Sequence, residues 1–138
     1  MSSLMEFLID NPVDNITADV FVSNRFTDSK TGEILKFKIK AMTGDEFSTY
    51  QRISVNLSKN KIKEFDSKKF NELVVLNNTI EPNFRDAASI TKAGCQTSEQ
   101  FMYKAILAGE IATLAEHISK LSGFDIDINE AKEEAKNY

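Results

Sequence analysis

Two segments near the start of the chain alternate between apolar and polar residues. In the first, residues 16–26, the apolar positions of one parity are Ile16, Ala18, Val20 and Val22. In the second, residues 34–42, Leu35, Phe37, Ile39 and Ala41 alternate with Lys36, Lys38 and Lys40. This two-residue period is typical of a half-buried antiparallel strand. Turn-forming residues separate the segments, so the pattern predicts a β-hairpin over residues 16–42.

Beyond the hairpin the spacing of apolar residues becomes helical. Thr43 and Glu46 have the spacing of a capping box, in which each side chain bonds the other residue's backbone at a helix start. Asp66 marks a second helix start, and that helix is expected to end before Pro82. Between these two helices, the lysine-rich residues 58–64 predict a solvated loop.

The longest helical pattern runs from Ser98 to Ser122. It begins at a further capping box, Thr97 with Gln100, and ends at a glycine in the position of a C-terminal cap, Gly123. Its apolar stripe is Leu107, Ile111, Leu114, Ile118 and Leu121, and an adjacent stripe of small residues is Ala105, Ala108, Ala112 and Ala115. The pattern predicts one uninterrupted helix of roughly 37 Å.

The two ends of the chain carry weaker patterns. Met5–Ile9 is a short apolar segment followed by Pro12, and two interpretations are open: one helical turn, or an extended arm that docks on another surface. Residues 124–138 are acidic with little apolar area, which favours a mobile tail.

These elements predict an α+β fold in a single domain of residues 1–138. An N-terminal antiparallel β-hairpin, residues 16–42, is followed by a mainly helical bundle, residues 43–123, with one long C-terminal helix. A chain of 138 residues is long enough to bury a core of its own.

Composition and charge narrow the range of functions. The net charge of −4 argues against a dedicated nucleic-acid binder, which usually carries a basic excess. Cys95 is the only cysteine, and no apolar run approaches the length of a membrane span. The first residues lack the basic and long apolar regions of a secretory leader. We therefore expect a cytoplasmic protein without a membrane partner.

Candidate catalytic residues are few. His117 is the only histidine, and Glu110 and Glu116 do not place it in an HExxH motif. Nothing near Cys95 in the sequence is expected to lower the pKa of its thiol. Glycine-rich phosphate loops and GxSxG elbows are absent from the sequence. We expect no catalytic residue, no metal and no cofactor.

Lysines gather in two parts of the sequence: Lys36, Lys38 and Lys40 in the second strand, and Lys59, Lys61, Lys63, Lys68 and Lys69 after the first helix. Such a cluster suits nucleic acid or an acidic protein. It also suits the solvent-facing side of a strand, guarding an exposed edge, which is the interpretation we favour.

Several long strings in the sequence resemble the XkdN-like family, the tail assembly chaperones of contractile-tailed phages and PBSX-like defective prophages. They are EFLIDNPVDN, KFKIKAMTGDEF, FDSKKFNELVVLNNTIEPNFRDA, KAGCQTSEQ and LAGEIATLAEHISKLSGFDIDINEAKEEAKN, which together span most of the chain. The resemblance implies a non-enzymatic protein of the host bacterial cytoplasm, absent from the mature particle. The resemblance also implies two partners, the tape measure protein and the tail tube protein. The chaperone would keep the tape measure protein soluble and bring tail tube subunits to it.

The family supplies no binding motif, so candidate contact residues come from the helical patterns. A helix with two adjacent apolar faces offers a groove to an amphipathic partner helix. The candidates on the long helix are Leu107, Ala108, Ile111, Ala112 and Ala115. Phe84 and Arg85 form a candidate exposed aromatic–arginine anchor, although Phe84 as part of the core is an equal alternative.

Three further possibilities stay open. The chain is compatible with weak homo-oligomers. A structural tail or baseplate subunit that stays in the particle is an alternative function, in which the hairpin extends a ring by strand pairing. A small DNA-binding regulator that uses the lysines is a third.

Overall fold

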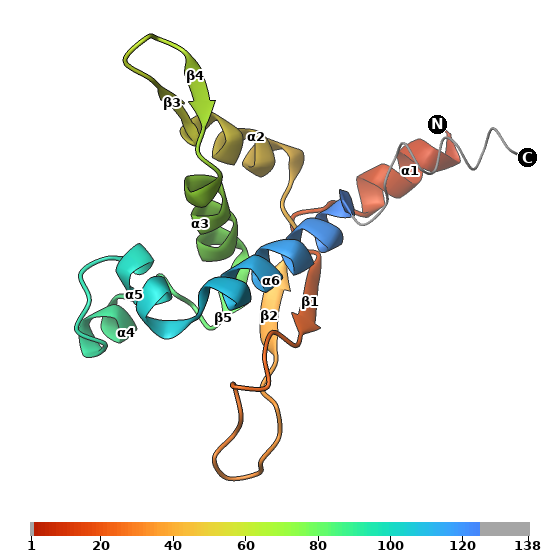
Figure 1. Cartoon of the computed structure of the whole chain (residues 1–138). Coiled ribbons are helices and arrows are strands. Elements are labelled where there is room, and N and C mark those ends of the chain that lie inside the picture. The colour runs from red at the N-terminus through yellow and green to blue at the C-terminus, as the bar shows by residue number, and fades with distance from the viewer. Residues whose placement is uncertain (1, 125–138) are drawn as a thin grey trace, which may run out of the picture.

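The computed structural model describes residues 2–124, and the expected mobile tail lies outside them except for residue 124. The elements in chain order are α1 (Ser3–Asp10), β1 (Thr17–Val20), β2 (Phe37–Lys40), α2 (Gly44–Ile53), β3 (Val55–Leu57), β4 (Lys63–Phe65), α3 (Ser67–Asn78), β5 (Thr79–Glu81), α4 (Ala87–Lys92), α5 (Ser98–Ala105), α6 (Ala108–Ser119) and the π-helical turn η1 (Lys120–Phe124) (Figure 1). The α+β class is confirmed.

The expected hairpin forms two strands of a three-stranded sheet. β1 pairs antiparallel with β2, from Thr17 opposite Lys40 to Val20 opposite Phe37. β5, which the sequence pattern did not indicate, pairs with the other side of β2. The strands are shorter than expected, because residues 21–36 leave the sheet as a long loop (Figure 1). Within β2 the alternation holds, since Phe37 and Ile39 are buried and Lys38 is exposed.

The predicted capping residues form hydrogen bonds at the starts of α2 and α3. The Thr43 hydroxyl accepts a hydrogen bond from the Glu46 N–H at 3.1 Å, and the Glu46 carboxylate accepts one from the Thr43 N–H at 3.0 Å. Asp66 accepts from the Lys69 N–H at 3.0 Å at the start of α3. Reciprocal bonds of this kind satisfy backbone donors that have no partner inside the helix.

The segment between α2 and α3 is a small hairpin where a loop was expected. β3 pairs antiparallel with β4, with Val55 opposite Phe65 and Leu57 opposite Lys63. Residues 58–64 supply the turn and most of β4, and the Ser58 N–H donates to the Ile62 carbonyl at 2.9 Å. Each strand has only three residues and all of them are exposed, so neither shows the alternation that marks a half-buried strand.

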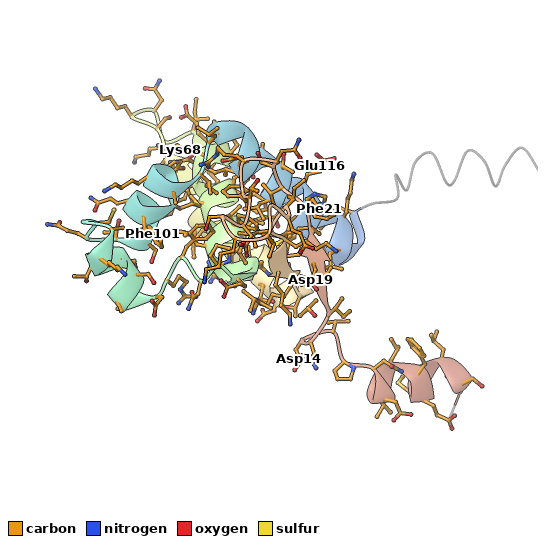
Figure 2. The ribbon with its side chains drawn as sticks, turned by 90° about the horizontal axis from the view of Figure 1, so that it is seen from below. Asp14, Asp19, Phe21, Lys68, Phe101 and Glu116 are labelled. Atoms are coloured by element: carbon orange, nitrogen blue, oxygen red, sulfur yellow. The ribbon has the colours of Figure 1, made fainter. Side chains whose placement is uncertain are left out.

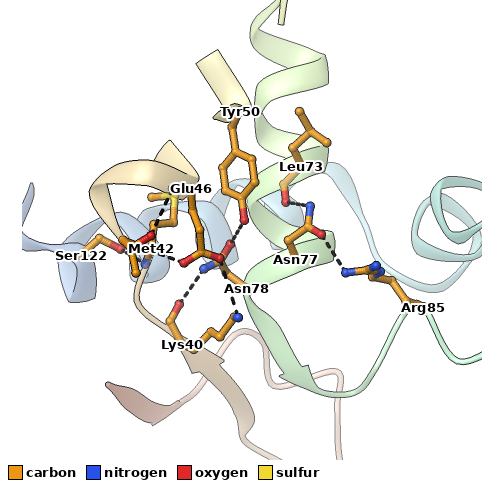
Figure 3. Close-up of polar contacts among 10 residues, drawn as sticks. Lys40, Met42, Glu46, Tyr50, Leu73, Asn77, Asn78, Arg85 and Ser122 are labelled. Carbon is orange, nitrogen blue, oxygen red and sulfur yellow. Dashed lines mark hydrogen bonds and ion pairs between the residues drawn. The ribbon is translucent and has the colours of Figure 1, made fainter. Parts of the chain in front are cut away.

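The core lies where β2, α3 and α6 meet. Its fully buried side chains include Ile39 from the sheet, Val74 and Val75 from α3, and Leu114 and Ile118 from α6. A polar network lies beside them (Figure 3). In it the buried Tyr50 hydroxyl donates to Asn78 Oδ1 at 2.8 Å, and Asn78 Nδ2 donates to the Lys40 carbonyl at 3.3 Å.

The expected long helix is two helices, α5 and α6, and this part of the prediction is wrong. Ile106 and Leu107 have extended backbone, with ψ of 152° and 160°. In a continuous helix the Ala105 carbonyl would accept from the residue four positions on. Instead it accepts a hydrogen bond from Arg25 Nη2 at 3.1 Å. A residue far away in sequence therefore occupies the backbone acceptor at the break.

The apolar segment near the N-terminus is a helix, α1. Ser2 caps it by accepting from the Met5 N–H at 3.1 Å, and none of its residues is buried. In Figures 1 and 2, α1 extends away from the rest of the molecule at the end of an extended linker. Of the two interpretations, the helical one is correct, and the helix has two turns where one was expected.

Candidate protein-binding surface

An ion pair holds the break between α5 and α6. Arg25, in the loop after β1, donates from Nη2 to Glu110 Oε1 at 2.6 Å and from Nε to Glu110 Oε2 at 3.0 Å. Glu110 also accepts from the Leu107 N–H at 2.7 Å. The carboxylate thus takes the place of the helical partner that this N–H would otherwise have.

The environment of Glu110 keeps it ionised. The pKa of Glu110 is lowered to about 2, chiefly by the hydrogen bond from Arg25 and also by the Leu107 N–H, against the opposing effect of burial. The Glu110 residue is only 6% exposed. A buried carboxylate is stable in the charged form only with such partners.

An apolar groove lies next to this break, and we call it the junction groove. Its lining residues come from α3, α5 and α6 and from the break between the last two: Lys68, Asn71, Tyr103, Ile106, Leu107, Ala108 and Ile111. It has a volume of about 350 Å³. Leu107 is 61% exposed, because the break turns its side chain outward at the start of α6. The groove therefore offers apolar area that this chain leaves uncovered.

Polar contacts fix one wall of the junction groove. The Tyr103 hydroxyl donates to Glu72 Oε1 at 2.7 Å, and Lys68 Nζ lies 5.2 Å from the centre of the Tyr103 ring. Partial burial, followed by the Glu72 carboxylate, raises the pKa of Tyr103. The ring is therefore held neutral, with one face against a cation.

The candidate residues of the expected long helix are divided by the fold. Leu107, Ala108 and Ile111 come together in the junction groove. Ala112 is exposed on α6 outside the lining, and Ala115 is buried in the core. The stripe of small residues is thus partly an internal packing surface, and the groove keeps three of the five candidates.

The expectation that Phe84 and Arg85 form an exposed anchor is wrong for Phe84, which is buried. Phe84 is 1% exposed and packs edge-on against the Phe101 ring, with centroids 5.9 Å apart. Its alternative interpretation, as part of the core, is confirmed. Arg85 is exposed and donates to Asn77 Oδ1 at 2.8 Å (Figure 3). A protein-binding role of Arg85 stays a prediction.

A second apolar groove, the aromatic groove, was not anticipated from the sequence. It lies between the long loop, β5 and α5, has a volume of about 350 Å³, and is lined by Phe26, Leu35, Lys36, Phe37, Glu81, Pro82, Phe84, Phe101, Ala105 and Ile106. Ile106 lines both grooves, so the break in the helix forms the wall between them. The lining residues of the aromatic groove come from distant parts of the sequence, so no local pattern could predict this groove.

Some of these lysines have a partner side chain nearby. Lys36 Nζ lies 4.8 Å from the centre of the Phe21 ring, Lys40 pairs with Glu46 at 3.8 Å, and Lys69 pairs with Glu72 at 3.9 Å. Loose contacts of this kind are ordinary for surface charges. This arrangement favours the interpretation of the lysines as solvent-facing side chains.

A metal site and a membrane-spanning helix are both absent from the described part of the chain. Among residues 2–124, no group of three or more His, Cys, Asp or Glu side chains is arranged to hold a metal ion. None of the helices in the same range is long and apolar enough to cross a membrane.

The sequence was compared with models of known protein families. The model of the phage XkdN-like tail assembly chaperone proteins matches residues 4–136, nearly the whole chain. A match of this extent covers the sheet, both grooves and, apart from the first residue of α1, the helices that the structure describes.

Individual relatives agree with this match. The chain is 28% identical over 140 residues to the uncharacterised protein YqbN of Bacillus subtilis, covering 95% of this chain and 91% of YqbN. It is 26% identical to the phage-like element PBSX protein XkdN of the same organism, covering 84% of this chain and 81% of XkdN. The crystal structure of YqbN superposes with a TM-score of 0.69 at 21% identity, over 92% of this chain and 99% of that one. This likeness shows a shared fold.

Proposed function

The chain belongs to the family of phage XkdN-like tail assembly chaperones, and from this premise we propose that it binds the tape measure protein, keeps it soluble, and helps to recruit tail tube subunits. The proposed action is non-enzymatic. It takes place in the host bacterial cytoplasm, before the particle is complete, and the chaperone is absent from the mature particle.

The junction groove is the observation that supports this proposal most directly. Its apolar lining includes Leu107, which is exposed over most of its surface beside the buried Ile111. An amphipathic helix binds such a groove by inserting side chains spaced three and four residues apart. A tape measure protein, as a long helical chain, carries apolar stripes of this spacing.

The charge around the junction groove favours a helix with acidic residues beside its apolar stripe. Lys68 is the charged residue in the lining, and its ammonium group lies over the Tyr103 ring at the groove wall. An acidic side chain of the bound helix would reach this ammonium group while its apolar neighbours fill the groove. The ion pair would set the orientation of the helix more than its affinity.

The size of the groove is consistent with temporary binding. A volume of about 350 Å³ is near the lower end of the roughly 300–1,000 Å³ typical of ligand pockets. Contacts of this size give weak individual affinities, and many copies along one long partner would add up. Assembly of the tube could then remove the copies one at a time.

Co-purification tests this function. A tagged copy of the chain, produced with the tape measure protein of the same genome, is expected to retain that protein on an affinity column. Mass spectrometry of purified particles is expected to find the tape measure protein and the tube protein without this chain. Its presence at stoichiometric amounts in particles would instead support a structural tail or baseplate subunit.

A further inference from the structure

The helix α1 carries more exposed apolar surface than its length explains. Its five large apolar side chains are between 49% and 68% exposed: Leu4, Met5, Phe7, Leu8 and Ile9. At helical spacing they cover about two-thirds of the circumference, and Glu6 and Asp10 share the remaining face. A helix that is apolar over so much of its surface is normally buried.

The length of α1 also indicates that the helix packs against another surface. It has 8 residues, and an isolated helix shorter than about 12–15 residues is marginal in water. In this chain it gains no stability from packing, because none of its residues is buried. A stable α1 therefore requires a further surface to pack against.

The aromatic groove has the shape and chemistry of such a surface. Eight of its ten lining residues are apolar, and four of them are phenylalanines. Its volume of about 350 Å³ is roughly twice the ~150 Å³ cavity that accepts a benzene molecule. The groove therefore has room for about two large apolar side chains of a docked helix.

The helix and the groove offer one pair of opposite charges. The only charged residues of α1 are Glu6 and Asp10, both acidic. The groove lining includes Lys36, and Lys38 is exposed on the adjacent strand. Glu81 also lines the groove, but it lies opposite Lys38 in the register of β2 and β5, so a cation lies across from it. Asp19 of β1 lies opposite Lys38 on its other side, so Lys36 is the cation that remains for an acidic residue of α1.

The aromatic groove lies at the far end of the sheet from the attachment point of α1. The linker reaches β1 at Thr17, whereas the groove is lined by Phe37, which pairs with Val20 at the opposite end of the strand pair. Figure 2 shows the separation: Phe101, on the groove, and Asp14, in the linker, lie on opposite sides of the molecule. To reach its own groove, α1 would have to reverse along the whole sheet. A second molecule presents the groove without that reversal.

We propose that α1 of one copy docks into the aromatic groove of a second copy of this chain. Leu4, Phe7 and Leu8, which share one face of the helix, enter the groove. Asp10, at the side of that face, lies beside Lys36 at the rim, and Glu6 lies on the opposite face in solvent. The inserted helix and the groove that receives it are different surfaces, so the contact is heterologous. Each copy can insert its α1 into one neighbour and receive the α1 of another. Repetition yields a head-to-tail chain or ring.

This self-association leaves the junction groove free, and it does not depend on the proposed function. A two-turn helix in a groove buries less than the roughly 1,200 Å² at which stable interfaces begin. The association is therefore weak and concentration-dependent. On a long partner it would bring neighbouring copies together.

Sedimentation velocity without any partner protein tests the proposal. The wild-type mass is expected to rise above the monomer value of 15.5 kDa as the concentration increases. The arm variant Leu4→Ser/Phe7→Ser and the groove variant Leu35→Glu are each expected to remain monomeric. Both change exposed side chains, so folding is expected to be unaffected, which circular dichroism checks. Leu57→Ser, an equally exposed apolar residue on the β3–β4 hairpin, is the matched control and is expected to associate like the wild type.

Mixing the two defective variants gives the sharper result. The arm variant keeps its groove and the groove variant keeps its arm, so an equal mixture is expected to form dimers and nothing larger. A wild type that stays monomeric at every concentration would overturn the proposal. So would association that survives in the arm variant, or a mixture that forms no dimer.

Cross-linking distinguishes a neighbour from the chain's own arm. In a Cys95→Ser background, Phe7→Cys in one population and Leu35→Cys in another are expected to form a disulfide between two chains after mixing. A double variant with both cysteines that cross-links only within one chain would show that α1 docks on its own groove, and would overturn the proposal.

Discussion

Arg25 and Glu110 are 85 residues apart in the sequence and form a two-point ion pair, with N–O distances of 2.6 and 3.0 Å. The pair connects the loop after β1 to the first turn of α6. Because Arg25 also bonds the last carbonyl of α5, this single side chain fixes where one helix ends and the next begins. The two grooves on either side of the break depend on it.

The ion pair predicts a specific dependence of stability on pH. The pKa of Glu110 is about 2 in the folded chain and 4.5 ordinarily, so its contribution to stability is fully present above pH 4.5. It is lost as the pH falls toward 2, because the unfolded chain then binds the proton more readily. Arg25→Met is expected to lower the free energy of unfolding at neutral pH and to flatten its decrease below pH 4.5, measured by urea denaturation.

An exposed ion pair provides the control for this experiment. Glu116 of α6 and Lys120, the first residue of η1, are paired at 3.1 Å, with both side chains more than half exposed. Lys120→Met is expected to leave the pH dependence unchanged, since exposed pairs contribute little. Equal effects of the two substitutions would contradict the role given to Arg25.

Asn78 is expected to be the most sensitive polar residue of the core. Its side chain accepts from Tyr50 and donates to the Lys40 carbonyl, which connects α2, α3 and β2. Asn78→Ala is expected to lower the free energy of unfolding by about 1–3 kcal/mol, because it leaves buried polar groups without partners. The neighbouring Asn77→Ala is the control. Asn77 is half-buried and bonds Arg85 at the surface, so a loss as large as that of Asn78→Ala would count against the network.

Tyr50 is expected to lose its proton only in strongly alkaline solution. Burial, with a smaller effect of the Glu46 charge, raises its pKa to about 12 from an ordinary value of 10. The neutral form is therefore part of the fold, and its contribution to stability is lost as the pH rises from 10 to 12. Ultraviolet absorbance during an alkaline titration measures this ionisation. Tyr50→Phe identifies the signal, and a component at about pH 10 that disappears in this variant would contradict the buried position.

Leu107→Glu is expected to separate binding from stability. The side chain is 61% exposed, so the free energy of unfolding is expected to change by no more than about 0.5 kcal/mol. Chemical denaturation of the purified variant measures this. A loss of several kcal/mol would mean that Leu107 belongs to the core, and that the junction groove is closed in solution.

The hairpin and the helix caps were predictable from the sequence because their signals are local. The alternation of Phe37, Lys38 and Ile39 is visible within one strand, and Thr43 with Glu46 forms a complete cap within four residues. Family membership was predictable for a different reason, since long strings match over nearly the whole chain.

The helix break and the aromatic groove were not predictable, because the interactions that make them join distant residues. No glycine or proline interrupts Ala105, Ile106 and Leu107, so the helical pattern runs through the break. Arg25 ends the helix from a loop that precedes it by 80 residues. For the same reason the sequence leaves Phe84 equally compatible with an exposed anchor and with the core, and only its contact with Phe101 places it in the core. The local sequence is compatible with both outcomes.

The proposed function requires the junction groove to bind the tape measure protein and to keep it soluble. The most direct test produces that protein in bacteria alone, with the wild-type chain, with Leu107→Glu, or with Leu57→Glu, which is 69% exposed on the β3–β4 hairpin outside the groove. The soluble fraction of the tape measure protein is the measured quantity. The wild type and Leu57→Glu are expected to keep it soluble, and Leu107→Glu is expected to leave it in the pellet. A tape measure protein that is equally insoluble with and without the wild-type chain would contradict the claim, as would full solubility with Leu107→Glu.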